Sequence, residues 1–273
     1  MNHSAEELTR LIGVVGGLVG GQPTRLEHAF RTQELYLMSD VMELDDIFSP
    51  GRTLFRKTVH FLSYHFILTR KRSTTTRVSD LELHVPPTVF HPKIFLTSSF
   101  FAQYIQSLDL RGKSVVEVGC GSGILSLSAA KAGAKTVLAL DINPAAVEAA
   151  KVNAAKNGLP QVEALESDLF SAVPAIRKFD VIICSPPSFS GEPRDEADRA
   201  WHAGPGYRDI LPLFDQAAQR LEADGTMYLL ISSDTNRTLI NNLINSAGFA
   251  CKEIRSRSIW VEAFHLLELT LTS

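Results

Sequence analysis

A glycine-rich segment, Glu117-Val-Gly119-Cys-Gly121-Ser-Gly123, carries the strongest chemical signal in the sequence. Its glycines directly follow the β-rich run Ser114–Val118 and precede a helical pattern. Glycines at such a turn let the backbone approach a ligand closely, and the helix behind them offers free N–H groups and a positive dipole end. The third glycine comes one position too early for the dinucleotide fingerprint G-x-G-x-x-G, and the lysine of a P-loop is absent. The segment predicts a ligand site, although a tight turn without a ligand would use the same glycines.

Two aspartates follow the next two predicted strands. Asp141 ends the second strand, 18 residues after Gly123, where a carboxylate can accept hydrogen bonds from both hydroxyls of a ribose. Asp168 follows the third strand, and its carboxylate could hold the edge of an adenine together with a neighbouring backbone N–H. Either residue could instead be an ordinary surface aspartate, and Ser167–Asp168 could simply cap a helix.

A proline-rich segment, Ser185-Pro186-Pro187-Ser188, follows the fourth predicted strand, Asp180–Cys184. The polar residues 188–206 come next, and a segment of this length without secondary structure is usually functional or disordered. We therefore expect a substrate loop or lid here. Its candidate substrate contacts are Phe189, Trp201, His202 and Tyr207. Trp201 and Tyr207 could instead anchor the loop to the body of the protein, and His202 could be a base or a solvated residue.

An alternation of strands and helices after residue 90 must position these groups. Helices are expected over residues 94–108, 123–132, 145–157, 209–221 and 236–247. This alternation predicts a parallel α/β sheet with helices on both faces. The last two strands, residues 250–257 and 260–271, are too close for a crossover helix and must form an antiparallel hairpin.

Residues 1–90 have a different, less regular pattern. A helix is predicted around Leu26–Val41, Leu54–Leu68 is helix or strand, Thr74–Thr76 reads as a polar linker or turn, and Leu81–Val85 as a short strand. We therefore expect an accessory domain over residues 1–90 that helps to select the substrate, and a catalytic domain over residues 91–273.

Composition and charge limit the function classes. The chain has 273 residues, of which 45% are hydrophobic, so it is neither disordered nor too short for a full core. The net charge of −3 hides a basic stretch, Arg52–Arg77, which holds seven Lys or Arg residues and no acid. Such a stretch is either a solvated face or a patch for an anionic partner such as RNA.

The 3 cysteines are far apart and form no C-x-x-C, which argues against a disulfide framework or a zinc knuckle and favours the reducing cytoplasm. No metal is expected, since no cluster of His, Cys and carboxylate residues has the spacing of metal ligands. The apolar run Leu11–Val19 is too short to span a bilayer, which takes about 20 residues. Glu6 and Glu7 before it have the wrong charge for a signal peptide. We expect no membrane partner.

Over residues 90–273 the chain resembles the class I S-adenosylmethionine-dependent methyltransferases. The matching features, in the family's order and spacing, are the E-V-G-C-G-S-G turn, Asp141-Ile142-Asn143-Pro144, Asp168 and Ser185-Pro186-Pro187-Ser188. The resemblance implies a Rossmann-like, seven-stranded, mostly parallel sheet with a C-terminal antiparallel hairpin, and S-adenosyl-L-methionine as cofactor. It also implies cofactor contacts. Glu117, Gly119, Gly121 and Gly123 would approach the methionine part, Asp141 the ribose, Ile142 the adenine ring and Asp168 the adenine amine, and Ser185 would also contact the cofactor.

Four segments resemble the amino-methylating branch of this family, which includes release-factor glutamine and ribosomal-RNA guanine-N2 methyltransferases. These are Val89-Phe90-His91-Pro92, D-I-N-P-A-A-V, N-A-A-K-N-G and S-P-P-S. The branch carries Asn or Asp, two prolines and an aromatic residue, and the resemblance implies that Ser185, Pro186 and Pro187 orient the N–H groups of the acceptor. Here Ser185 replaces Asn or Asp, and Ser188 replaces the aromatic residue, with Phe189 adjacent.

A similarity to ribosomal-RNA cytosine-C5 methyltransferases, in S-P-P-S-F and Gly206–Ile210, is disfavoured. Those enzymes need a cysteine nucleophile, and Ile231-Ser232-Ser233 supplies none at the corresponding place. The favoured function is N-methylation of an amide or amine on a protein side chain or an RNA base. The alternatives are a small-molecule N- or O-methyltransferase and a non-catalytic cofactor-binding protein. The class of methyl acceptor and the oligomeric state stay open.

Overall fold

The computed structural model describes residues 72–92, 96–259 and 262–272. The segments expected around residues 11–19, 26–41 and 54–68, and most of the basic stretch, lie outside the described residues. The accessory domain over residues 1–90 therefore stays a prediction. Within the described residues no helix is long and apolar enough to cross a membrane.

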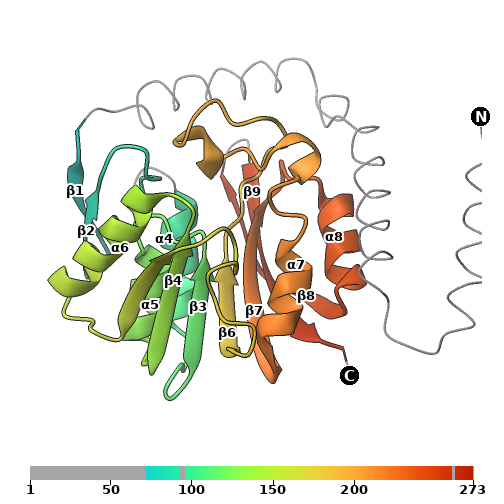
Figure 1. Cartoon of the computed structure of the whole chain (residues 1–273), viewed down its shortest axis with the longest axis horizontal. Helices are drawn as coiled ribbons and strands as arrows, with labels where there is room; N and C mark the ends of the chain where they lie inside the picture. The colour runs from blue at the N-terminus through green and yellow to red at the C-terminus, as the bar shows by residue number, and fades with distance from the viewer. Residues whose placement is uncertain (1–71, 93–95, 260–261, 273) are drawn as a thin grey trace, which may run out of the picture. The chain divides into compact units, whose positions relative to one another are not determined.

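A seven-stranded sheet forms the centre of the fold (Figure 1). Its strand order is β5-β4-β3-β6-β7-β9-β8. The five strands from β5 to β7 run parallel, whereas β9 pairs antiparallel with both β7 and β8. The strands are β3 (Ser114–Val118), β4 (Thr136–Asp141), β5 (Val162–Glu166), β6 (Phe179–Cys184), β7 (Leu221–Ser232), β8 (Phe249–Ile259) and β9 (Glu262–Leu271). The predicted Rossmann-like sheet with a C-terminal antiparallel hairpin is confirmed.

Helices cover both faces of this sheet (Figure 1). They are α4 (Leu96–Gln106), α5 (Ile124–Lys131), α6 (Pro144–Lys156), α7 (Leu213–Arg220) and α8 (Arg237–Ser246). Helices α4, α5 and α6 share one core with Val115, Val137 and Val181, while α7 and α8 pack on the opposite face. Side chains alternate between the faces of a strand, so both faces are apolar and both are buried. One helix differs from expectation: it begins at Leu213 rather than at residue 209.

A small hairpin, β1 (Thr74–Val78) and β2 (Leu81–Val85), packs beside α6. Thr74–Thr76 were expected in a linker or turn, and this expectation is wrong. The β-branched threonines form an edge strand because the paired strand β2 is anchored, with three apolar side chains in the same core as α4 and α5. The anchored side chains are Leu81, Leu83 and Val85.

Asn153 of α6 and Asn157, which caps the C-terminal end of this helix, hold β2 through its backbone. Asn153 accepts a hydrogen bond from the N–H of His84 (2.7 Å) and donates one to its carbonyl (2.9 Å). Asn157 does the same with Glu82, at 3.0 and 2.8 Å. A side-chain amide offers the same donor and acceptor as a peptide group, so α6 satisfies β2 as a neighbouring strand would. The hairpin is thereby fixed next to the glycine-rich turn, since Asn153 also donates to the carbonyl of Ser122 (2.9 Å).

Candidate active site

The predicted site residues meet at the carboxyl edge of the parallel strands. The glycine-rich segment follows β3, Asp141 ends β4, Asp168 follows β5 and Ser185 follows β6. The chain winds from β3 to β4 and β5 on one side, and continues through β6 and β7 on the other. The carboxyl ends of β3 and β6 therefore flank a topological switch point, where open α/β sheets bind their ligands.

The glycine-rich turn has two glycines that face open space and one that packs. Gly119 and Gly121 have φ values of +76° and +52°, and no described atom lies within 4 Å of a Cβ added at either position. A Cβ at Gly123 would lie 3.0 Å from the Cβ of Ala150, so this glycine lets α5 approach α6 closely. The turn thus offers a bare backbone surface on its outer side.

The carboxylate of Asp141 supports the glycine-rich turn and can accept further hydrogen bonds. Its carboxylate accepts one hydrogen bond at each oxygen, from the N–H of Gly121 (2.8 Å) and of Asn143 (2.9 Å). Burial raises the pKa of this carboxyl group, while the two backbone N–H groups oppose that effect. Each carboxylate oxygen has a second lone pair, so two ribose hydroxyls could still be accepted. The adjacent Ile142 is 41% exposed, which leaves an apolar surface for a flat ring.

Glu117 lies beneath the turn and is only 2% exposed. It accepts hydrogen bonds from the backbone N–H (2.7 Å) and the hydroxyl of Ser126, in the first turn of α5. Burial raises its pKa to about 8, because ionisation in this dry position is costly, and the nearby charge of Asp141 adds to the effect. The predicted contact of Glu117 with the methionine part of the cofactor stays a prediction.

Asp168 is exposed at the same edge, and Ser167 caps the turn. The hydroxyl of Ser167 donates to the carbonyl of Leu169 (2.8 Å) and accepts from the N–H of Ala172 (3.1 Å). The N–H of Ser167 donates to the carbonyl of Asp141 (2.9 Å), which connects the ends of β4 and β5. The sequence left open whether Ser167–Asp168 caps a helix or Asp168 binds an adenine. The hydroxyl of Ser167 makes the capping hydrogen bonds, and Asp168 is exposed.

The segment after β6 begins with an exposed Ser185, followed by half-buried Pro186, Pro187 and Ser188. The loop beyond it was expected to lack secondary structure, but it folds back on itself. Phe189 donates to the carbonyl of Trp201 (2.9 Å) and accepts from the N–H of Ala203 (2.9 Å). Two short 3-10 helices, η3 (Asp198–Ala200) and η4 (Pro205–Tyr207), complete the loop.

Aromatic side chains gather beside this loop. Trp201, 8% exposed, packs with the partly buried Phe90 and Phe189. The ring of His202 lies 5.8 Å from that of Phe189, and its Nδ1 is 3.2 Å from the carboxylate of Asp198. Phe90 was missed as a candidate site residue, although its position in V-F-H-P, close before α4, was a usable signal.

Asp198 fixes the outer part of the loop. It is 1% exposed and accepts three hydrogen bonds from Arg194, through the backbone N–H, Nε and Nη2, at 2.9–3.0 Å. Burial alone would raise the pKa of Asp198, but these hydrogen bonds and the neighbouring His202 outweigh it and lower the pKa. Tyr207 is buried as well, at 2% exposure, which supports the alternative that it anchors the loop.

Comparisons with known proteins decide between the families compatible with this geometry. The model of the ribosomal protein L11 methyltransferase (PrmA) family matches residues 96–185. A putative protein N5-glutamine methyltransferase of Methanocaldococcus jannaschii is 34% identical over 165 residues, which cover 58% of this chain and 82% of that protein. This chain belongs to the class I S-adenosylmethionine-dependent methyltransferases. S-adenosylmethionine is its cofactor, and the resemblance seen in the sequence is confirmed.

Other relatives match this methyltransferase over a shorter region. The L11 methyltransferase of Enterobacter sp. is 42% identical over 89 residues, and the match spans 33% of this chain and 30% of that protein. Among solved structures, an L11 methylase from Lactobacillus delbrueckii has a TM-score of 0.52 at 23% identity, covering 68% of this chain and 84% of the other. A Thermus thermophilus 16S rRNA N2 G1207 methyltransferase, solved with AdoMet and guanosine, has a TM-score of 0.56 at 22% identity, covering 74% and 50%. Both structures share the fold.

The residues at the carboxyl edge fit the cofactor of a methyltransferase. A nucleoside needs an acceptor for its ribose hydroxyls, an apolar surface for its base and a backbone without side chains in the way. Asp141 has spare lone pairs, Ile142 is exposed, and no described atom lies within 4 Å of a Cβ added at Gly119 or Gly121. Within the described part of the chain, no group of three or more His, Cys, Asp or Glu side chains could hold a metal ion.

The cysteines give this methyltransferase no nucleophile near the site. Cys120 and Cys184 are buried, and burial raises the pKa of both thiols well above the ordinary value. The exposed Cys251 lies on β8, at the far edge of the sheet. These positions agree with the argument against cytosine-C5 chemistry.

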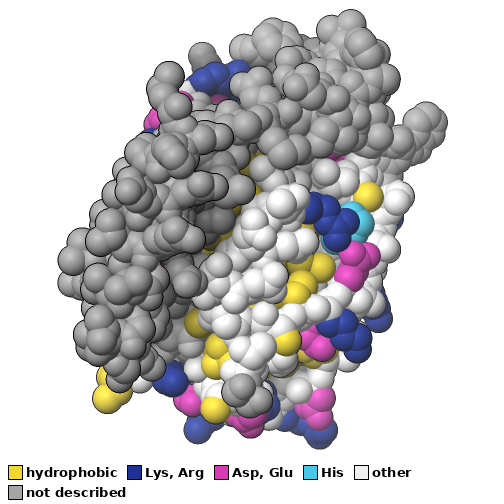
Figure 2. Space-filling view, turned by 90° about the vertical axis from the view of Figure 1, so that its right-hand side faces the viewer, with side chains coloured by type: hydrophobic (Ala, Val, Ile, Leu, Met, Phe, Trp, Pro, Cys, Tyr) yellow, Lys and Arg dark blue, Asp and Glu magenta, His cyan; other side chains and the backbone are white. Residues whose placement is uncertain are grey.

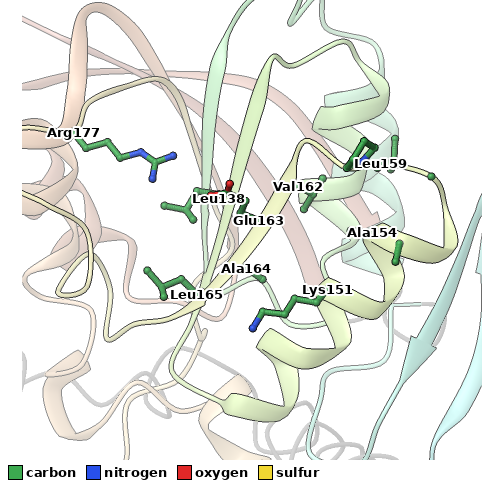
Figure 3. A pocket seen from close by; sticks show the side chains of 12 residues that line it. Leu138, Lys151, Ala154, Leu159, Val162, Glu163, Ala164, Leu165 and Arg177 are labelled. Atoms are coloured by element: carbon green, nitrogen blue, oxygen red, sulfur yellow. The ribbon is translucent and has the colours of Figure 1, made fainter.

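Two other surfaces of the methyltransferase are less informative. A hollow of about 600 Å³ lies between α6 and the edge strand β5 and contains none of the predicted site residues. Figure 3 shows Lys151 and Arg177 on opposite sides of it, with Leu138 and Leu165 between them. In Figure 2 basic and acidic side chains are interspersed over the described part of the visible face, so no single-sign patch for RNA is seen there.

Proposed function

We propose that this methyltransferase transfers the methyl group of S-adenosylmethionine to a nitrogen of a protein side chain, and that this nitrogen belongs to an amide. The M. jannaschii relative, 82% of which is matched, is a putative protein N5-glutamine methyltransferase. The L11 methyltransferases, at 42% identity over their shorter match, also carry a protein substrate in their name. Relatives named for RNA substrates are at most 22% identical among the solved structures reported above, which supports only the fold.

The single observation that carries the proposal is the chemistry of the segment at the end of β6. Proline has no backbone N–H, so Pro186 and Pro187 present carbonyl acceptors and no donors. The exposed hydroxyl of Ser185 adds another acceptor beside them. A site rich in acceptors and poor in backbone donors suits an acceptor group with two N–H bonds, such as a primary amide.

We assign the cofactor to the carboxyl ends of β3, β4 and β5, next to the acceptor site at the end of β6. Asp141 holds the ribose, Ile142 packs on the adenine, Asp168 binds its amine, and the turn with Gly119, Gly121 and Gly123 over Glu117 holds the methionine part. When bound, the cofactor supplies a methyl group attached to a positively charged sulfur. Ser185 lies between the two binding regions, since β6 is the direct neighbour of β3.

The aromatic side chains form the outer wall of the proposed acceptor site. Ser188 stands where the related enzymes carry an aromatic residue, and Phe189, one position later, takes over that role. Phe90 and Trp201 pack beside Phe189 from other segments. A planar amide would stack on such a wall, and the hydrogen bonds to Ser185 and Pro186 would direct its nitrogen lone pair. Orientation of this kind supplies much of the acceleration of a transfer between two bound groups. The ring of His202 lies beside that of Phe189, and we assign it a substrate contact from there.

Domain organisation and localisation belong to the same proposal. Residues 1–90 would select the substrate, and the described part of them, the β1–β2 hairpin, is held beside the cofactor turn by Asn153. The 3 cysteines are unpaired, which favours the cytoplasm as the place of action.

The chemical nature of the product tests the proposal. Purified protein is incubated with methyl-labelled S-adenosylmethionine and a cell extract, and the label is followed after protease, ribonuclease and acid treatment. An amide product keeps the label through ribonuclease and releases it as methylamine in hot acid. Label on an acid-stable amino acid indicates an amine, label lost to ribonuclease indicates an RNA base, and label in the small-molecule fraction contradicts a macromolecular substrate. The Asp141→Ala protein serves as the background control.

A further inference from the structure

The hydroxyl of Tyr207 connects two loops at the carboxyl edge of the sheet. It donates a hydrogen bond to the carbonyl of Ser188 (3.0 Å) and accepts one from the N–H of Asn236 (3.1 Å). Ser188 follows β6 and ends the S-P-P-S segment, whereas Asn236 follows β7 and caps α8. One hydroxyl thus uses both its donor and an acceptor site to link residues that are 48 positions apart in the sequence.

The backbone around Tyr207 is bent to place this hydroxyl. Its φ is +61°, a left-handed conformation that bulky residues rarely adopt. Gly206 immediately before it has a φ of +60° and donates to the hydroxyl of Ser190 (2.9 Å). Conformations of this kind persist only where surrounding contacts enforce them, and they are common near functional sites. Tyr207 as a whole is 2% exposed, so it offers a substrate almost no surface.

The S-P-P-S segment needs such an external attachment. Pro186 and Pro187 cannot donate a backbone hydrogen bond, so half of the usual backbone pairing with a neighbouring strand is missing there. At one end the segment is held by Cys184, which pairs with Leu229 of β7. At the other end the carbonyl of Ser188 is held by Tyr207. The proposed acceptors, Ser185 and the carbonyls of the prolines, lie between these two points.

We propose that Tyr207 is a positioning residue, which acts through Ser188 to fix the acceptor-orienting segment relative to the end of β7. The inference rests on the proposed function, because it assigns the orientation of the acceptor to Ser185 and Pro186. Loss of the hydroxyl would leave the ring in place and release the hydrogen bonds to Ser188 and Asn236. The segment could then shift by a fraction of an ångström, and small displacements of this kind reduce transfer rates strongly.

The test is Tyr207→Phe, with Tyr228→Phe as the matched control. Tyr228 is also buried, but its ring contacts Tyr104 in the core between β7 and α4, with centroids 5.4 Å apart. Initial rates of label transfer at saturating cofactor, measured against the concentration of extract protein, give an apparent kcat and KM for each protein. Calorimetry with S-adenosylmethionine gives the cofactor Kd.

In Tyr207→Phe the apparent kcat is expected to fall about tenfold, while the apparent KM and the cofactor Kd change by less than about twofold. Tyr228→Phe should keep the wild-type kcat. A wild-type kcat in a folded Tyr207→Phe protein overturns the inference. A change confined to KM also overturns it, because it assigns Tyr207 to substrate binding. Absence of transfer by the wild-type protein itself overturns the proposed function, and the positioning role with it.

A second pair of variants removes the same link from its other end. The φ of Asn236 is −65°, which proline also adopts, so Asn236→Pro deletes the N–H with little backbone change. Asn236→Ala removes only the capping side chain and controls for the loss of the helix cap. If Tyr207→Phe does not fold, a lower kcat in Asn236→Pro than in Asn236→Ala supports the inference, and equal values overturn it.

Discussion

The carboxylate of Asp141 is the part of the cofactor site whose removal has the most calculable effect. Asp141→Ala deletes the two oxygens that accept from Gly121 and Asn143, together with the lone pairs that remain on each. The cofactor then loses its proposed acceptor for both ribose hydroxyls. The turn also loses its support, because two backbone N–H groups are left without these partners.

The loss can be estimated from the hydrogen bonds alone. A hydrogen bond to a charged acceptor contributes about 1.5–3 kcal/mol. Two ribose hydroxyls at the lower value give about 3 kcal/mol, which corresponds to an increase in Kd of about 100-fold. Asp141→Asn should show a smaller loss, because the amide keeps one oxygen acceptor.

Isothermal titration calorimetry with S-adenosylmethionine measures the effect, and thermal unfolding without ligand shows whether the variant is folded. Glu163→Ala, which removes an exposed carboxylate from the neighbouring strand β5, controls for the change in net charge. The control should bind as the wild type does. A folded Asp141→Ala protein with a Kd within about threefold of the wild type would refute the assignment of the ribose to Asp141.

Three further outcomes concern the framework of the site. Asn153→Ala should lower the free energy of unfolding by about 2–4 kcal/mol, because a fully buried amide loses three hydrogen bonds. Asn157→Ala, at a more exposed position, should lower it less. Urea denaturation measures both, and equal losses would contradict the special role of Asn153. Burial raises the pKa of Glu117 from 4.5 to about 8, so folding favours its protonated form, and the stability it contributes is complete below about pH 4.5 and is lost as the pH rises through 8. Relative to Glu117→Gln, the wild type should therefore lose stability in urea denaturation between pH 5 and 9, and parallel curves would argue against this. Gly123→Ala should destabilise the fold by more than Gly158→Ala, since both have positive φ but only Gly123 would place its new Cβ 3.0 Å from α6; equal melting temperatures would be inconsistent with close packing there.

Much of the fold follows from local patterns in the sequence. Strands and helices alternate regularly after residue 90, and the carboxyl ends of parallel strands must lie at one edge of the sheet. The convergence of the glycine-rich turn, Asp141, Asp168 and Ser185 was therefore predictable before the structure was known. The order of the motifs predicted S-adenosylmethionine as the cofactor, and the comparisons confirmed this prediction.

The features that could not be predicted depend on contacts between distant parts of the chain. Thr74–Thr76 form a strand only because α6 holds the partner strand, through Asn153, which lies 69 residues from His84. An added Cβ at Gly123 would meet α6, and nothing in its own segment distinguishes it from Gly119. The loop after β6 was expected to be irregular because its composition is polar, yet its backbone pairs with itself.

Contacts between distant parts of the chain also decide the roles of single residues that a sequence pattern leaves open. A tyrosine in a polar loop reads equally well as a substrate contact or as an anchor, and only the partners of the Tyr207 hydroxyl distinguish the two. Phe90 precedes α4 by few residues, and its packing with Phe189 and Trp201 is not encoded by any spacing.

The most direct test is the rate of methyl transfer by Ser185→Ala, measured with labelled S-adenosylmethionine and extract protein under saturating cofactor. Ser258→Ala, which alters an exposed serine on β8, is the matched control. The expected result is a rate at least about tenfold below the wild type, with an unchanged cofactor Kd and a normal rate for the control. Equal rates for Ser185→Ala and the wild type would contradict the central claim that the end of β6 orients the methyl acceptor.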